Sequence, residues 1–261
     1  MKMKKMNKKA ISFAVGMVLL AIAITVFAFY MVFFVSNERI KDIVTPLDLI
    51  NIQNDAREDV FFIKESANYA SQRAVYSVLN EIPMKSSSPY KKYQDIDIWN
   101  DCEPDIKKVE EKFLDEFSQE FYSLIKSSDK DIIKNLDGKY VFSLNNNILK
   151  LQSGQELEYH TLLEIHAVYK TSVSFEKELP FSLNILSDIH TRSKNAVNTC
   201  KDDFDCITEK MNSDDLDDFD FEFTKNGDYI IFTARTKDRF FFNDGTLKYD
   251  KISFDYAISL T

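Results

Sequence analysis

The longest apolar segment of the chain runs from Ala10 to Val35. Its 26 residues include no charged one, and only Ser12, Gly16 and Thr25 lie outside the apolar set. As a helix the segment would be about 39 Å long, whereas the hydrocarbon core of a bilayer is about 30 Å thick. Its fifteen Leu, Ile, Val and Phe residues favour insertion by about 6 kcal/mol in total. The pattern therefore predicts a transmembrane helix over residues 10–35.

The flanks of this segment predict its orientation. The stretch is longer than the apolar region of a cleavable secretory signal, about 7 to 15 residues, and it ends in bulky residues, so we expect the anchor to be retained. Five lysines lie in residues 1–9, whereas acidic and basic residues are mixed after Val35. The positive-inside rule then predicts a single-pass protein of the cell membrane, with residues 1–9 in the cytoplasm and the rest outside.

Residues 36–83 form a predicted amphipathic helical stalk. Thr45 and Pro46 are typical of an N-cap followed by proline at the first helical position, and Pro83 cannot continue a helix. Apolar residues between these points recur at steps of three and four, which predicts a helix over residues 46–82. The stripe consists of Ala56, Val60, Ile63, Ala67, Ala70, Ala74, Val78 and Ile82.

This stripe has two possible partners. It can pack against the chain's own sheet, or it can pair with a second copy in coiled-coil fashion. We favour the first because Phe61, Phe62 and Val75 widen the stripe beyond a narrow seam. A second route to a homo-oligomer is the pair Ser12 and Gly16, since small residues four apart allow two membrane helices to approach closely.

Residues 84–261 are expected to form an α+β domain outside the membrane. After a loop at Met84–Tyr93, apolar residues at helical spacing predict a helix that begins near Pro104. From Lys139 onward the period changes to two, which predicts strands, the longest over Leu163–Leu179. Turns are expected at Asn145–Asn147, Asn226–Gly227 and Asn243–Gly245, and helices after Pro180 and around Phe204–Met211.

The predicted fold class is therefore α+β. It comprises an N-terminal transmembrane helix, a long amphipathic helix, and then a mainly antiparallel sheet packed with helices.

Charge argues against nucleic acid as a partner. Of the 33 basic residues, five precede Val35, so the later part of the chain has 28 basic and 42 acidic groups and a formal charge of −14. Such a surface repels phosphate backbones, whose binding needs clustered lysine and arginine. We expect the lipid bilayer as a partner, and the sequence does not identify a protein partner.

The sequence contains none of the common catalytic motifs. The glycines after the apolar segment are isolated, so no glycine-rich loop can hold a phosphate. No nucleophile elbow, zinc-binding helix or Cys-x-x-Cys pair is present. We predict no catalytic residue, no cofactor and no metal site. The isolated glycines are Gly138, Gly154, Gly227 and Gly245.

The three histidines and the acidic residues of Asp214–Glu222 are candidate metal ligands. His160 and His166 would lie about 20 Å apart on an extended strand, so they cannot share one ion. Structural roles are favoured for them and for His190. Within the acidic run Asp214–Glu222, the alternation that starts at Asp218 has Phe223 at the sixth position, where a calcium loop needs glycine. This favours a solvated strand face over a calcium site.

The three cysteines allow three pairings. Cys200 and Cys206 are separated by five residues between two predicted helices. Because the domain is expected in an oxidising exterior, a disulfide between them is favoured. Cys102 is then left over, either as a small buried apolar residue or as a cross-link to a neighbour.

The N-terminus resembles the class III leader of type IV pilins and archaellins. The matching residues are Lys8-Lys9-Ala10 followed by Ile11-Ser12-Phe13-Ala14-Val15. The resemblance implies cleavage by a prepilin-type peptidase near Lys9, Ala10 and Ile11, after which the helices pack into a filament core. Ala10 replaces the glycine common before the cut, and the early glutamate of bacterial pilins is absent. The whole chain also resembles uncharacterised single-pass membrane proteins of small-genome archaea, a similarity that implies no activity.

Three functions follow as hypotheses. The favoured one is a membrane-anchored extracytoplasmic structural or interaction protein without catalytic activity. The alternative is a pilin-like filament subunit processed near Lys9-Ala10. The third is an enzyme of unknown type, because active sites are assembled in space from residues far apart in sequence.

Overall fold

The computed structural model describes residues 8–85, 92–100, 102–160, 168–212, 216–243 and 246–260, without the side chains of residues 8–19, 31–46, 243 and 247. The chain divides into two compact units, and each is described by itself. The first comprises Met1–Ala56 and Tyr159–Tyr169, and the second comprises Arg57–Glu158 and Lys170–Thr261.

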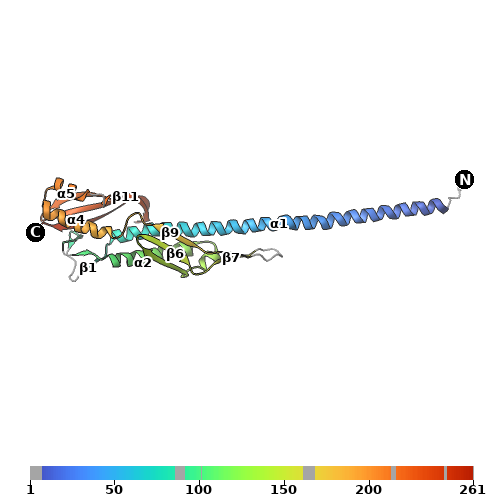
Figure 1. The fold of residues 1–261 in the computed structure, drawn as a ribbon, viewed down its shortest axis with the longest axis horizontal. Helices are drawn as coiled ribbons and strands as arrows, with labels where there is room; N and C mark the ends of the chain where they lie inside the picture. Colours follow the sequence, from blue (N-terminus) through green and yellow to red (C-terminus); the bar gives the residue numbers. More distant parts are fainter. Residues whose placement is uncertain are drawn as a thin grey trace. The chain divides into compact units, whose positions relative to one another are not determined.

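The longest element is helix α1 (Lys8–Asn80) (Figure 1). The predicted helix start at Thr45–Pro46 is wrong, because α1 continues through both residues. A Thr-Pro pair marks a helix start only where the preceding chain is not already helical. Within a long helix proline removes one backbone hydrogen bond, at a cost of about 3 kcal/mol, and the turns on both sides keep theirs. The predicted end is confirmed to within two residues, since α1 stops at Asn80.

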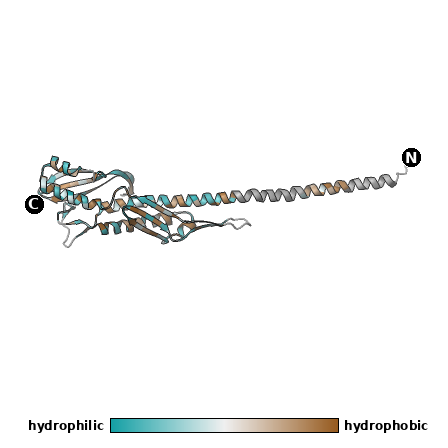
Figure 2. Cartoon of the chain, in the orientation of Figure 1, coloured by the Kyte–Doolittle hydropathy of each residue, from teal (hydrophilic) through white to brown (hydrophobic). Residues whose placement is uncertain are grey.

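In the first unit, most of the described side chains of α1 are exposed, whereas Ala56 is buried. Leu20–Tyr30 is exposed along its whole length, and Figure 2 colours it mostly as hydrophobic. Among the residues open to description, no helix is both long and apolar enough to cross a membrane.

The second unit contains a five-stranded sheet. Every pairing in it is antiparallel except that between β12 and β3, which is parallel. Helices α4 and α5 contact strands of this sheet (Figure 1). The strand order is β10 (Phe219–Asn226), β11 (Tyr229–Asn243), β12 (Leu247–Ser259), β3 (Ile96–Ile98) and β2 (Lys92–Tyr93); α4 is Ile185–Cys200 and α5 is Phe204–Met211.

A smaller sheet in the same unit packs against α2 (Ile106–Ser127). The Asn145–Asn147 hairpin is confirmed, because Asn146 and Asn147 adopt φ of 48° and 67° between the paired strands β5 and β6. Strand order in this antiparallel sheet is β5 (Tyr140–Asn145), β6 (Ile148–Ser153) and β9 (Ser174–Glu178). The remaining short elements are β1 (Met84–Lys85), which pairs with β4 (Glu103–Pro104), and α3 (Asp131–Lys134).

Two further strand predictions need correction. The single strand predicted over Leu163–Leu179 is instead β8 (Val168–Thr171) and β9, with Ser172 and Val173 between them outside any strand. β8 pairs with β7 (Leu157–His160), whereas β9 pairs with β6, so the chain changes partners at this break. Residues 161–167 lie outside the described residues. The two-residue turn predicted at Asn226–Gly227 lies one residue later. Because Asn226 pairs with Tyr229, the turn consists of Gly227 and Asp228.

The part of α1 in the second unit is packed into the fold. Its apolar stripe from Ile63 to Val78 is buried, which confirms that the stripe packs within its own unit. On one side Tyr76 stacks on Phe242 of β11, with ring centroids 4.3 Å apart. On another side Arg73 pairs with Glu120 of α2 at 2.6 Å. Of the residues expected to widen the stripe, Val75 is buried, but Phe61 is 65% exposed.

Candidate functional site

The predicted leader junction lies on α1. The backbone of Lys9, Ala10 and Ile11 is helical, as is that of Ser12 and Gly16. The side chains of these residues lie outside the described part of the chain. The predictions of processing and of helix pairing at these positions therefore remain predictions.

The cysteine pair is brought together by a tight turn between two helices. Cys200 ends α4, and Asp203 caps α5 by accepting hydrogen bonds from the backbone N–H groups of Asp205 and Cys206 at 3.1 and 3.2 Å. The Cα atoms of Cys200 and Cys206 are 5.6 Å apart, and the two residues form a disulfide. The predicted pairing is confirmed. Cys102 is the free cysteine and is half-buried.

Replacing Cys200 and Cys206 together by serine is expected to lower the free energy of unfolding by about 2 to 3 kcal/mol, because a short loop is no longer closed in the unfolded chain. Urea unfolding of the full chain in detergent measures this change. Without reductant, alkylation of the denatured wild type should label only Cys102. Labelling of all three cysteines without reductant would show that the bond does not form.

The predicted solvated acidic face is observed for the described part of the run. In β10, Asp220 and Glu222 are exposed and pair with Lys251 at 3.0 Å and with Arg235 at 3.6 Å. Asp214 and Asp215 lie outside the described residues. Elsewhere in the described ranges, no group of three or more His, Cys, Asp or Glu residues is placed to hold a metal ion.

His190 has the structural role that was predicted for it. It is buried on α4, and its Nε2–H donates a 2.7 Å hydrogen bond to the carbonyl oxygen of Trp99. His160 is exposed on β7, and His166 lies outside the described residues. Burial lowers the pKa of His190, and the hydrogen bond to Trp99 opposes this effect in part.

One turn further along α4, Ser193 faces the sheet. Its hydroxyl donates to the carbonyl of Ile189 at 2.7 Å, so the Tyr256 hydroxyl donates to Ser193 Oγ at 2.6 Å. Burial raises the pKa of Tyr256. These hydrogen bonds satisfy the buried hydroxyl groups of Ser193 and Tyr256, and the bond between the two residues joins α4 to β12. They do not form a pair of nucleophile and base, because His190 is bonded to a backbone carbonyl instead of to Ser193.

The second unit should lose stability as the pH falls from about 7 to 5. The pKa of His190 is below its ordinary value near 6.5, so the unfolded chain takes up a proton at a pH where the native chain does not. The stabilising contribution is complete above the unfolded pKa and decreases as the pH drops towards the native pKa. Urea titrations at several pH values measure the effect, and His190→Gln should reduce the slope. An unchanged slope in this variant would exclude His190 as its source.

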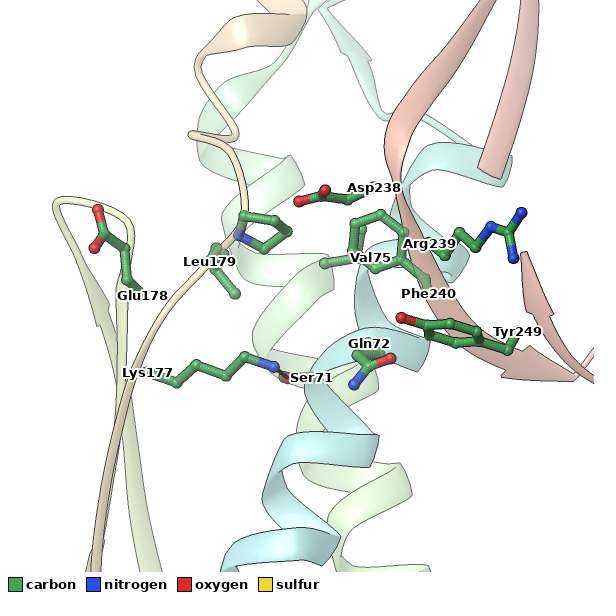
Figure 3. A pocket seen from close by; sticks show the side chains of 11 residues that line it. Ser71, Gln72, Val75, Lys177, Glu178, Leu179, Asp238, Arg239, Phe240 and Tyr249 are labelled. Carbon is green, nitrogen blue, oxygen red and sulfur yellow. Dashed lines mark hydrogen bonds between the residues drawn. The ribbon is translucent and has the colours of Figure 1, made fainter. Parts of the chain in front are cut away.

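A cavity with a volume of about 350 Å³ lies within the second unit. Figure 3 shows Lys177 reaching in from β9 towards Ser71 on α1, with Asp238 at the other end of the cavity. The remaining lining residues are Gln72, Val75, Glu178, Leu179, Pro180, Arg239, Phe240 and Tyr249.

Sequence reasoning missed this cavity, although one signal was present. Along the predicted strand, Val173, Phe175 and Leu179 occupy the inward positions, and Lys177 shares their alternation. A lysine on the apolar side of a strand indicates a buried cation that needs a polar environment. The partners on α1 lie about a hundred residues earlier, so their proximity could not be predicted.

A second cavity, of about 340 Å³, is lined by Glu58, Phe62 and the segment after α2. Its buried carboxylate, Asp59, forms an ion pair with Lys130 at 2.5 Å. This contact fixes α1 to the segment that follows α2, which is a structural role.

Comparison with known proteins gives no match: no protein-family model, no curated protein and no solved structure is similar to the chain. The chain is therefore described by its own features. It has an α+β unit that includes the end of the long helix α1, and the N-terminal segment of this helix is apolar.

Proposed function

We propose that the chain is a single-pass membrane protein that holds a non-catalytic α+β unit outside the cell for assembly or recognition. The observation on which this depends most is the 26-residue uncharged segment of α1 preceded by five lysines. Because α1 extends to Asn80 and its last turns are buried in the second unit, one helix would serve both as anchor and as part of the folded unit.

Two further features support an extracytoplasmic, non-catalytic role. A disulfide persists in an oxidising exterior, and the Cys200–Cys206 bond suits that location. In neither described cavity does a histidine lie beside a nucleophile, and the buried His190 is held by a backbone carbonyl.

Alkaline carbonate extraction of membranes tests the anchoring. The full chain should remain in the membrane pellet, because a spanning helix resists removal of peripheral proteins. Recovery of the chain in the supernatant would contradict the proposal. A Cys200/Cys206 double serine variant is a suitable control, since it alters the folded unit but leaves the apolar segment unchanged.

A pilin-like filament subunit is the second candidate. The observation in its favour is that α1 includes the Lys9-Ala10 junction and is unbroken from there to Asn80. A freed N-terminus at this junction would leave a helix that starts with apolar residues, as packing in a filament core requires. The N-terminal residue of the mature chain distinguishes the candidates: Met1 supports the retained anchor, whereas Ala10 or Ile11 supports the filament subunit.

A further inference from the structure

Lys177 is a half-buried cation with neutral partners. Its ammonium group donates to the side-chain oxygen of Asn68 and, at 3.2 Å, to the hydroxyl of Ser71. A lysine ammonium has three N–H donors, so one remains for another acceptor. Ser71 is itself fixed, because it is buried and donates to the carbonyl of Asn68 at 2.7 Å.

No carboxylate of the described residues forms an ion pair with Lys177. The charge of Glu65 acts on it from a greater distance and favours the protonated form, but burial outweighs this effect and lowers the pKa of Lys177. A desolvated cation is costly unless an anion compensates it. An anion bound beside the ammonium group would therefore stabilise the protonated form of Lys177.

The rest of the cavity has a polar end and an apolar wall. At the polar end, Gln72 accepts a hydrogen bond from the backbone N–H of Phe241 through Oε1 at 2.7 Å, which leaves its amide NH₂ as a donor. The wall is formed by Val75, Leu179 and Phe240, all at most 3% exposed. Figure 3 shows Asp238 at the end away from Lys177, so its carboxylate does not take the place of an anion beside the ammonium group.

We propose that this cavity binds a small organic carboxylate, with the carboxylate group at Lys177 and a short apolar chain against Val75, Leu179 and Phe240. Donors at one end and an apolar wall beside them match a ligand of that polarity. The volume of about 350 Å³ lies at the low end of the range of ligand pockets, about 300 to 1,000 Å³, and is ample for a short-chain carboxylate.

Propionate and propylamine are suitable probes, because they have similar shapes and opposite charges. Saturation-transfer NMR on the full chain in detergent micelles should show transfer to propionate and much less to propylamine. Lys177→Met should weaken propionate binding about tenfold or more, as expected for loss of a hydrogen bond to a charged group. Lys150→Met, on the neighbouring strand β6, removes an exposed lysine paired with Glu176 and should leave binding unchanged.

A measurement on the wild type covers the case in which Lys177→Met does not fold. With ¹³C-labelled lysine ε-carbons, the lysine signal with the lowest pKa should shift to a higher pKa when propionate is added and not when propylamine is added. Equal saturation transfer to both probes, unchanged propionate binding in a folded Lys177→Met variant, or an unchanged lysine titration would overturn the proposal.

Discussion

Replacing Phe117 by alanine is expected to lower the free energy of unfolding of the second unit by about 3 to 5 kcal/mol. Phe117 is fully buried on α2, between Phe113 and Phe121 of the same helix. Its ring is nearly perpendicular to that of Phe142 on β5, with ring centroids 5.2 Å apart. Truncation removes the apolar contacts of the ring and leaves a cavity that the packed neighbours cannot fill. Trp99, the only tryptophan and a buried one, reports unfolding by fluorescence in urea.

Phe61→Ala is the matched control. This ring is on α1 in the same unit but is 65% exposed, so its truncation should change stability by about 0.5 kcal/mol or less. Similar losses for the two variants would contradict the packing of α2 against β5 described above.

Introducing arginine at both Leu20 and Ile24 is expected to release the chain from membranes. An arginine near the middle of a spanning helix costs about 2.5 to 3.5 kcal/mol, so two of them cancel an insertion gain of about 6 kcal/mol. Both positions lie in the apolar segment and are exposed. Fractionation after carbonate extraction should move the double variant from the pellet to the supernatant.

The control is alanine at the same two positions, which shortens the side chains without adding charge. This variant should remain in the pellet, because about thirteen of the fifteen large apolar residues are kept and their insertion gain is only slightly reduced. Retention of the double arginine variant in the pellet would show that something other than the apolar segment holds the chain to the membrane.

Elements specified by neighbouring residues were predicted well. The buried phenylalanines of α2 recur every four residues, a spacing that places them on one face of a helix. Asn146 and Asn147 tolerate positive φ, which a two-residue hairpin turn requires. Helix α5 was placed correctly at Phe204–Met211. In each case the signal lies within one or two turns of chain.

Features that depend on distant parts of the chain were not predicted. Ile96–Ile98 pairs in parallel with β12 through Tyr256 and Ala257, about 160 positions away, and two or three residues of strand give no local signal. The break at Ser172–Val173 arises because β8 and β9 have different partner strands. At Pro46 the local signal for a helix start is overridden by the helix that precedes it.

The candidate site shows the same division. Lys177 could have been recognised as an anomaly, because it follows the alternation of Val173 and Leu179. Its partners Asn68 and Ser71 come from α1, and only the tertiary fold brings them to the end of β9. The disulfide was accessible to sequence reasoning, because Cys200 and Cys206 are close in the chain.

Protease protection tests the central proposal most directly, because it reports on which side of the membrane the folded unit lies. A protease added to whole cells should digest the polypeptide after Val35, and inside-out vesicles should protect the same residues. If whole cells protect the chain while inside-out vesicles expose it, the proposed orientation is wrong, and the α+β unit does not act outside the cell.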